Sequence, residues 1–231
     1  MSPEQRKEAS ELELHKRGIR INVQLHVIES DEEVELRTPQ ALMQRMLALW
    51  AVTGVASGGA IDCAIDGTTG DDAARYRLYL ETHGLIDCLS AQERAFLFAE
   101  ASPEKPVEEL RTHFVEKQEA LYFLAWAAGL TDKLAVPTQA ANLKQVLKLF
   151  PRALEAPVRL QAALKPRRKG QLLDWSDLLY RLHWAVRHAH ITGRDAPGNL
   201  NAVAVREWHQ AANWLCQYEE ENDWDKVSTE T

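Results

Sequence analysis

The sequence predicts a mainly α-helical fold, a single-domain multi-helix bundle that has room for one small β-hairpin near its N-terminus. Three observations lead to this prediction. Apolar residues recur at spacings of three and four along most of the chain, which is the period of an amphipathic helix. Proline and glycine stand at the ends of these segments, where they begin and end helices. One stretch, residues 19–36, shows instead the alternation of a strand.

We expect the single domain, residues 1–231, to have three parts. These are an N-terminal helix with its hairpin or arm (residues 1–37), a helical core (residues 38–218) and an acidic C-terminal tail (residues 219–231). Apolar spacing, caps and stop residues predict the helices of the core. They span residues 38–58, 71–83, 91–100, 106–128, 142–150, 157–164, 171–192 and 202–218. Residues 60–70, rich in Gly and Thr, are expected to form a loop.

The N-terminal part gives the only strand signal. Ser2-Pro3 supplies a cap and a first-turn proline for the first helix, and Gly18 is a natural stop. The apolar residues that follow alternate with polar ones: Ile19, Ile21, Val23, Leu25 and Val27. A turn at residues 30–32 would let residues 33–36 return as a short second strand. An extended, unpaired arm is the alternative.

Composition and charge exclude several classes of partner. The 231 residues carry a formal charge of −7, whereas nucleic acid binding needs a net basic surface or a strong basic stripe. The basic cluster at residues 165–169 is short and is expected to be a solvated loop. No apolar run reaches the length of a membrane span, and the N-terminus lacks the apolar segment of a secretory signal. We therefore expect a cytoplasmic protein that binds neither nucleic acid nor membranes.

Residues typical of metal sites and covalent catalysis occur without the required spacing. Cys63, Cys88 and Cys216 are odd in number and far apart, which is typical of free thiols in a reducing compartment. There is no Gly-x-Ser-x-Gly elbow and no phosphate-binding glycine loop after a strand. His183 and His190 share a helix face two turns apart, too far to meet one ion without a third element. The sequence therefore predicts no metal and no cofactor.

The helix predicted at residues 171–192 places Tyr, Arg, His and Trp side chains on a segment that should be buried. Buried polar groups are costly without partners, so we expect a hydrogen-bonded network around this helix. The candidate network or pocket consists of Glu119, Tyr122, Tyr180, Arg181, His183 and Arg187. We expect Glu119 to pair with Arg181 or Arg187 across a helix interface. The set is interpreted either as a second packed face or as the wall of a pocket that binds an anion or performs acid–base chemistry.

Two dipeptides near the C-terminus form a second candidate site. Asn213-Trp214 and Trp224-Asp225 place two large aromatic side chains beside the acidic tail. A buried Trp224 would anchor the tail on the fold, whereas an exposed Trp224 would dock a partner protein.

Residues 119–130, 177–187, 213–215 and 224–231 carry a pattern that resembles the bacterial domain-of-unknown-function family numbered 4272. The early segments 6–10, 18–19 and 33–40 are similar to that family too. Residues 208–210 and the loop near residues 67–70 depart from its pattern. The resemblance implies a compact, mostly α, cytoplasmic bacterial protein, and it carries over no catalytic residue.

Two classes of function follow from these observations. The acidic charge and the missing catalytic signature favour a non-catalytic protein-binding module, one version of which is an immunity or antidote protein against a basic toxin. The alternative is an enzyme or small-ligand sensor with a Tyr/Arg/His/Glu pocket between helices. Burial discriminates between them, since a closed network indicates structure and an open cleft presenting His183 and Arg187 indicates ligand chemistry.

Overall fold

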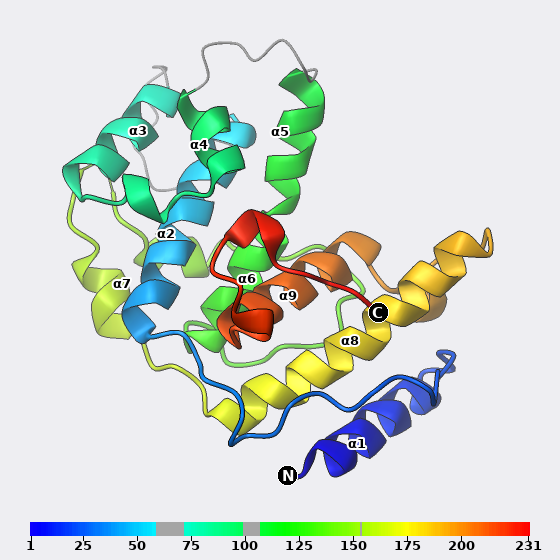
Figure 1. Cartoon of the computed structure of the whole chain (residues 1–231). Coiled ribbons are helices and arrows are strands. Elements are labelled where there is room, and N and C mark those ends of the chain that lie inside the picture. Colours follow the sequence, from blue (N-terminus) through cyan, green and yellow to red (C-terminus); the bar gives the residue numbers. More distant parts are fainter. Residues whose placement is uncertain (59–71, 99–106, 153) are drawn as a thin grey trace. The chain divides into compact units, whose positions relative to one another are not determined.

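The computed structural model describes residues 1–58, 72–98, 107–152 and 154–231. The described residues form α-helices joined by loops and 3-10 turns, with no β-strand among them (Figure 1). The predicted mainly α fold is therefore confirmed. The chain divides into two compact units. Unit 1 contains residues 1–37, 133–140 and 167–231, and unit 2 contains residues 38–132 and 141–166. The single-domain organisation remains a prediction.

Unit 1 is built on a long central helix. This helix, α8 (Lys169–Ile191), packs against α1 (Pro3–Lys16) and α9 (Ala202–Leu215). Unit 1 also contains the 3-10 turns η3 (Pro197–Asn199), η4 (Tyr218–Glu220) and η5 (Trp224–Lys226). The apolar core of this unit is formed by Leu14, Ile19, Val136, Leu182, Ala185, Val186, Leu200 and Val205. The apolar stripe of α8 thus faces inward, as its spacing requires.

Local signals set the ends of these helices. At the start of α1, the Ser2 hydroxyl accepts from the Gln5 amide while the Gln5 side chain accepts from the Ser2 amide. Gly18 follows α1 with a φ of +65°, a conformation that glycine adopts without a Cβ clash. Asn201 caps α9 by accepting from the Ala204 amide at 3.1 Å.

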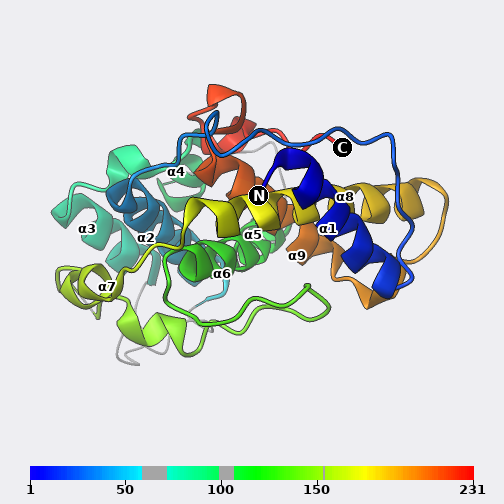
Figure 2. The ribbon, with the colours of Figure 1, turned by 90° about the horizontal axis from the view of Figure 1, so that it is seen from below.

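The β-hairpin expected in residues 19–36 is wrong, and the extended alternative describes this segment. We call it the arm; it leaves the end of α1 and runs back along α8 (Figures 1 and 2). Its backbone carbonyls accept hydrogen bonds from side chains of α1 and α8 rather than from a second strand. Lys7 donates to the carbonyls of Val23 and Leu25, and Lys169 donates to those of Asp31 and Val34. The alternating apolar pattern therefore marks an arm that is fastened to helices.

Unit 2 is arranged around α2 (Pro39–Ala56). Packed against α2 are α3 (Asp72–Thr82), α4 (Ala91–Phe98), α5 (Val107–Glu116), α6 (Gln118–Ala127) and the 3-10 turn η1 (Ile86–Cys88). Trp50 of α2 meets the rings of Tyr76 and Tyr79 edge-on, with centroids 4.9 and 5.2 Å apart. A Cβ at Gly54 would lie 2.2 Å from the Tyr76 hydroxyl, so this helical position requires glycine. The unit also contains η2 (Val146–Leu149) and α7 (Val158–Ala163).

Unit 2 departs from the predicted helices at two places. The helix predicted at residues 106–128 is interrupted at Lys117, whose ψ of −11° leaves the helical value. The helix predicted at residues 142–150 is reduced to the 3-10 turn η2. The loop expected at residues 60–70 lies outside the described residues, as does Cys63.

Candidate functional site

The candidate network residues lie in two different units. Glu119 and Tyr122 belong to α6 of unit 2, whereas Tyr180, Arg181, His183 and Arg187 belong to α8 of unit 1. Glu119 is buried and accepts a hydrogen bond from the backbone amide of Ala141, 2.8 Å away in the same unit. Tyr122 is half-buried. The structure therefore gives Glu119 a role in fastening residue 141 to α6.

Arg181 pairs with Asp177, one turn earlier in the same helix. Its Nε and Nη2 donate to the two carboxylate oxygens of Asp177 at 2.9 and 2.7 Å. The exposed fractions of these side chains are 2% and 0%, so the pair is buried. Nη2 also donates to the His26 carbonyl at 3.0 Å and thereby holds the arm against α8.

His183 forms a buried chain of hydrogen bonds with two residues of α9. Its Nδ1 lies 3.0 Å from Nδ1 of His209, and Nε2 of His209 lies 3.2 Å from Nδ2 of Asn213. Asn213 Nδ2 also donates to the Ser228 carbonyl at 2.8 Å, which fixes the orientation of the amide. The second amide hydrogen therefore points to His209 Nε2, so His209 carries its proton on Nδ1 and donates it to His183.

Burial keeps both histidines of this chain neutral. It lowers the pKa of His209 to about 3, with His183 as a further cause. It also lowers the pKa of His183 to about 4, and the charges of Arg187 and Arg206 add to the effect. Both ring nitrogens of His209 are engaged. His209 therefore has no free nitrogen to take a proton from a neighbouring hydroxyl, which is what a catalytic base requires.

The C-terminal tail is held by contacts along its length. Trp224 is 3% exposed, and its ring meets the ring of Trp214 edge-on at 5.7 Å. Gln210 donates to the Trp224 carbonyl at 2.9 Å, within the turn that contains Asp225. At the end of the chain, the exposed Arg187 donates to the Thr231 hydroxyl at 3.3 Å. The structure thus buries Trp224 against Trp214.

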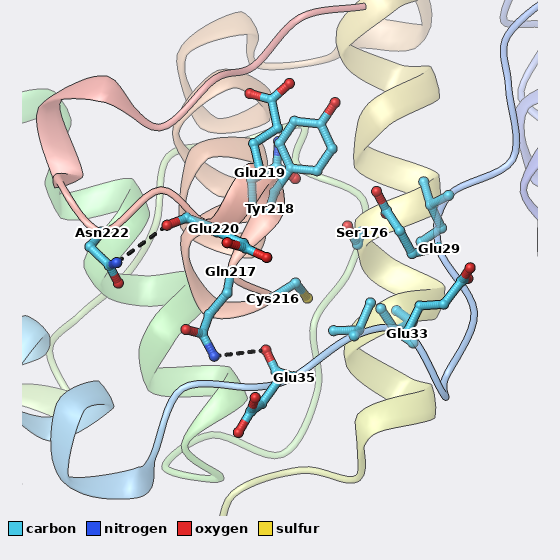
Figure 3. Close-up of a pocket in the computed structure, with 14 residues that line it drawn as sticks. Glu29, Glu33, Glu35, Ser176, Cys216, Gln217, Tyr218, Glu219, Glu220 and Asn222 are labelled. Carbon is cyan, nitrogen blue, oxygen red and sulfur yellow. Dashed lines mark hydrogen bonds between the residues drawn. The ribbon is translucent and has the colours of Figure 1, made fainter.

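A cavity of about 500 Å³ opens between the arm, α8, the end of α9 and turn η4 (Figure 3). Five of its lining residues are glutamates, and none of the described residues that line it is Lys or Arg. The glutamates are Glu29, Glu33, Glu35, Glu219 and Glu220. We call it the acidic cavity. The acidic tail is evident in the sequence but this cavity is not, because the arm and the tail lie some 180 residues apart in the sequence and meet only through the fold.

A second cavity of about 340 Å³ adjoins the acidic cavity. The two share the lining residues Ile28, Glu29, Ser176, Asn213 and Tyr218. The second cavity is also lined by Tyr180, one of the predicted pocket residues, and by the end of the tail at Glu230 and Thr231. Neither cavity is lined by Arg181, His183 or Arg187. Of the four predicted pocket residues on α8, Tyr180 therefore borders a cavity.

Two polar atoms at the shared wall have no hydrogen-bond partner among the described residues. Ser176 is 6% exposed, and no described group donates to or accepts from its hydroxyl. Asn213 is similarly buried; its amide nitrogen is engaged, but its carbonyl oxygen accepts no hydrogen bond from a described residue. Figure 3 shows Ser176 on the side of α8 that faces the turn at Gln217 to Glu220.

The backbone of turn η4 is strained where it borders the acidic cavity. Gln217, Glu219 and Glu220 have φ values of 53°, 56° and 56°, in the left-handed region that costs a non-glycine residue about 1 kcal/mol. Cys216, next in the wall, is a poor nucleophile, because burial raises the pKa of its thiol to about 12 and the charge of Glu29 adds to the effect. In the part of the chain that the structure describes, no three His, Cys, Asp or Glu side chains could hold a metal ion together.

The family model described as Domain of unknown function (DUF4272) matches residues 6–227. The chain belongs to the DUF4272 family. The resemblance inferred from the sequence is thereby confirmed over nearly the whole chain. No curated protein and no solved structure matches it. Within the described ranges, no helix of this DUF4272 member is long and apolar enough to cross a membrane.

The chemistry of the site follows from its charges and its free acceptors. The cavities combine carboxylates, carbonyl and hydroxyl oxygens with apolar patches at Ile28, Val34 and Leu173. Such a lining attracts a ligand that is positively charged and rich in hydrogen-bond donors.

Proposed function

We propose that this DUF4272 protein is a non-catalytic binding module that holds a positively charged segment of a partner protein in the acidic cavity. The observation that carries the proposal is a lining of five glutamates without a basic side chain among the described lining residues. A field of one sign in a cleft steers an oppositely charged partner and sets its orientation. An antidote that neutralises a basic toxin is one protein of this kind.

Three features of the site support binding over catalysis. Both nitrogens of His209 are engaged in hydrogen bonds, so this histidine has no free nitrogen with which to activate a hydroxyl of the cavity wall. The Cys216 thiol stays protonated at neutral pH because burial raises its pKa. His183, the expected acid–base group, is buried in the hydrogen-bonded chain and does not line either cavity.

A small organic cation is a second candidate ligand. The volume of about 500 Å³ favours it, because pockets for small molecules typically fall between roughly 300 and 1,000 Å³. The small cation would bind in the same acidic cavity as the basic protein segment and would differ from it only in size. Spermidine, a compact polycation, is a suitable probe for it.

The test is a binding titration with a defined basic probe. An eight-residue peptide of alternating Arg and Gly is titrated into the full chain at low salt and at physiological salt. The double variant Glu219→Gln/Glu220→Gln should weaken binding at least tenfold. The matched control Glu8→Gln/Glu32→Gln removes the same charge from exposed residues outside the cavity and should bind like the wild type.

Two outcomes would overturn the proposal. Equal losses in both double variants would show that net charge acts without a site. Absence of binding even at low salt would show that the acidic cavity does not take a basic segment. Tight binding of spermidine with weak binding of the peptide would move the function to the small-cation candidate.

A further inference from the structure

We propose that the acidic cavity is a guanidinium site, which takes an arginine side chain of the partner and binds its N–H groups at Ser176, Asn213 and the surrounding carboxylates. This inference rests on the proposed function and gives it a chemical specificity. Its occupant is one arginine, and its floor is the shared wall of the two cavities.

The floor presents acceptors that the protein leaves unused. Ser176 is a buried residue, but its hydroxyl is not among the side-chain atoms that are shut off from solvent, because the residue borders both cavities. No described residue supplies a hydrogen-bond partner for this hydroxyl. An N–H group of a ligand seated in the cavity would supply one.

The amide of Asn213 is held so that it offers an acceptor rather than a donor. Its nitrogen gives both hydrogens away, one to the Ser228 carbonyl and one to His209. The amide cannot flip without breaking both bonds, so the carbonyl oxygen is the end left without a partner. The hydrogen bond to His209 therefore helps to orient Asn213 so that its carbonyl oxygen, and not its nitrogen, is offered to the cavity.

The carboxylates of the lining are likewise available. Glu29 and Glu219 make no hydrogen bond or ion pair with a described side chain. The arginines near them in unit 1 are engaged elsewhere: Arg6 with Asp31 and Asp174, Arg181 with Asp177, and Arg37 with the Glu221 carbonyl. An external cation would therefore not have to displace an internal one.

The distribution of acceptors favours a guanidinium over an ammonium group. They come from separate elements, namely the arm, α8, α9 and turn η4, so they surround the cavity. A guanidinium carries five N–H donors in a plane, whereas an ammonium carries three on one atom. The Tyr218 ring offers a flat face for stacking, and Val34 and Leu173 offer apolar surface for the methylene stem.

The experiment compares three capped tripeptides that differ at one residue. Gly-Arg-Gly, Gly-Lys-Gly and Gly-citrulline-Gly are titrated into the full chain and followed by two-dimensional NMR. Citrulline keeps the shape of arginine without its charge. We expect the arginine peptide to bind tightest, the lysine peptide about tenfold more weakly, and the citrulline peptide not measurably.

Ser176→Ala tests the floor directly. It should weaken the arginine peptide by about tenfold, because a hydrogen bond to a charged group is lost. It should leave the melting temperature unchanged, since the hydroxyl has no partner among the described residues. The control is Ser10→Ala, which removes a buried hydroxyl of unit 1 away from both cavities and should not change binding.

The outcomes separate this inference from the proposed function. If lysine and arginine peptides bind equally, or if Ser176→Ala binds like the wild type, the guanidinium site is wrong while a basic partner still fits. If neither basic peptide binds, both proposals fail. Preference for arginine together with its loss in Ser176→Ala supports both.

Discussion

The two units treat their buried polar groups differently. In unit 2, Arg45 donates to both carboxylate oxygens of the buried Glu93, which also accepts from the Ser90 amide at the start of α4. That arrangement satisfies a helix cap and an ion pair with the same carboxylate. In unit 1, a buried chain of hydrogen bonds runs from His183 through His209 to Asn213, whose amide nitrogen also donates to the Ser228 carbonyl. The carbonyl oxygen of Asn213 accepts no hydrogen bond from a described residue and lies at the wall of the acidic cavity. Around Glu93, therefore, the polar groups of unit 2 bond to one another, whereas the hydrogen-bonded chain of unit 1 reaches the wall of the acidic cavity.

Breaking a buried ion pair should have the largest effect in either unit. We expect Asp177→Ala to lower the free energy of unfolding by about 3–5 kcal/mol, because Arg181 would remain buried without its carboxylate. Glu93→Ala should cost a similar amount in unit 2. Chemical denaturation measures both. Asp195→Ala, at an exposed position, serves as the control, and a loss below about 1 kcal/mol in Asp177→Ala would show that the pair is not structural.

Removing the C-terminal tail should destabilise unit 1. A chain that ends at Glu221 loses the buried Trp224 and the acceptor that Ser228 provides for Asn213. We expect it to unfold with about 3–4 kcal/mol less stability, near the cost of removing one large buried side chain. Thermal and urea melts of the truncated chain test this. An unchanged stability would mean that the tail is free for a partner, as the alternative interpretation of Trp224 requires.

Acid should destabilise the protein through the histidine chain. The pKa values of His183 and His209 are about 4 and 3 in the folded protein, below the ordinary value of 6.5. The unfolded chain therefore binds protons that the folded protein does not, so stability is complete above pH 6.5 and is lost as the pH falls toward 4. For His183 the loss is roughly 3 kcal/mol over this window.

Urea melts between pH 7.5 and 4 measure this dependence. In the double variant His183→Gln/His209→Gln, this part of the pH dependence should disappear, while titration of the carboxylates persists. If the wild type and the variant lose stability in parallel, the two histidines do not titrate as their burial requires.

The smallest expected effect lies in the strained turn of unit 1. Glu219→Gly should relieve the strain of the left-handed backbone at this residue. We expect the free energy of unfolding to rise by less than about 1 kcal/mol, with a slightly higher melting temperature. The same change should weaken binding of the basic peptide, because it removes a carboxylate from the acidic cavity. A variant that gains stability and keeps full affinity would show that the strain has no connection with binding.

Most helices of this fold could be predicted from the sequence because their signals are local. Ser2, Gly18 and Asn201 mark helix ends through contacts with residues a few positions away, and the structure has those contacts. The hairpin was wrong because alternation records which side chains are buried and not what pairs with the backbone. The carbonyls of the arm accept hydrogen bonds from lysine side chains rather than from a partner strand, and no local sequence pattern predicts this kind of pairing.

The candidate site was less accessible to the sequence than the fold. The burial of the Arg181–Asp177 pair could not be predicted from the sequence, because it depends on the arm, whose His26 carbonyl accepts from Arg181. The acidic cavity needs the arm and turn η4 side by side, and that neighbourhood exists only in the folded chain. The bond between His183 and His209 likewise joins two helices whose pairing the sequence does not encode locally.

Mapping where an arginine peptide binds tests the guanidinium site most directly. Backbone amide shifts of the full chain are recorded while capped Gly-Arg-Gly is added. We expect the largest changes at Ser176, Asn213 and Tyr218, and we expect them to vanish in Glu219→Gln/Glu220→Gln. Shifts scattered over exposed glutamates such as Glu8 and Glu32, and unaffected by that double variant, would contradict the guanidinium site.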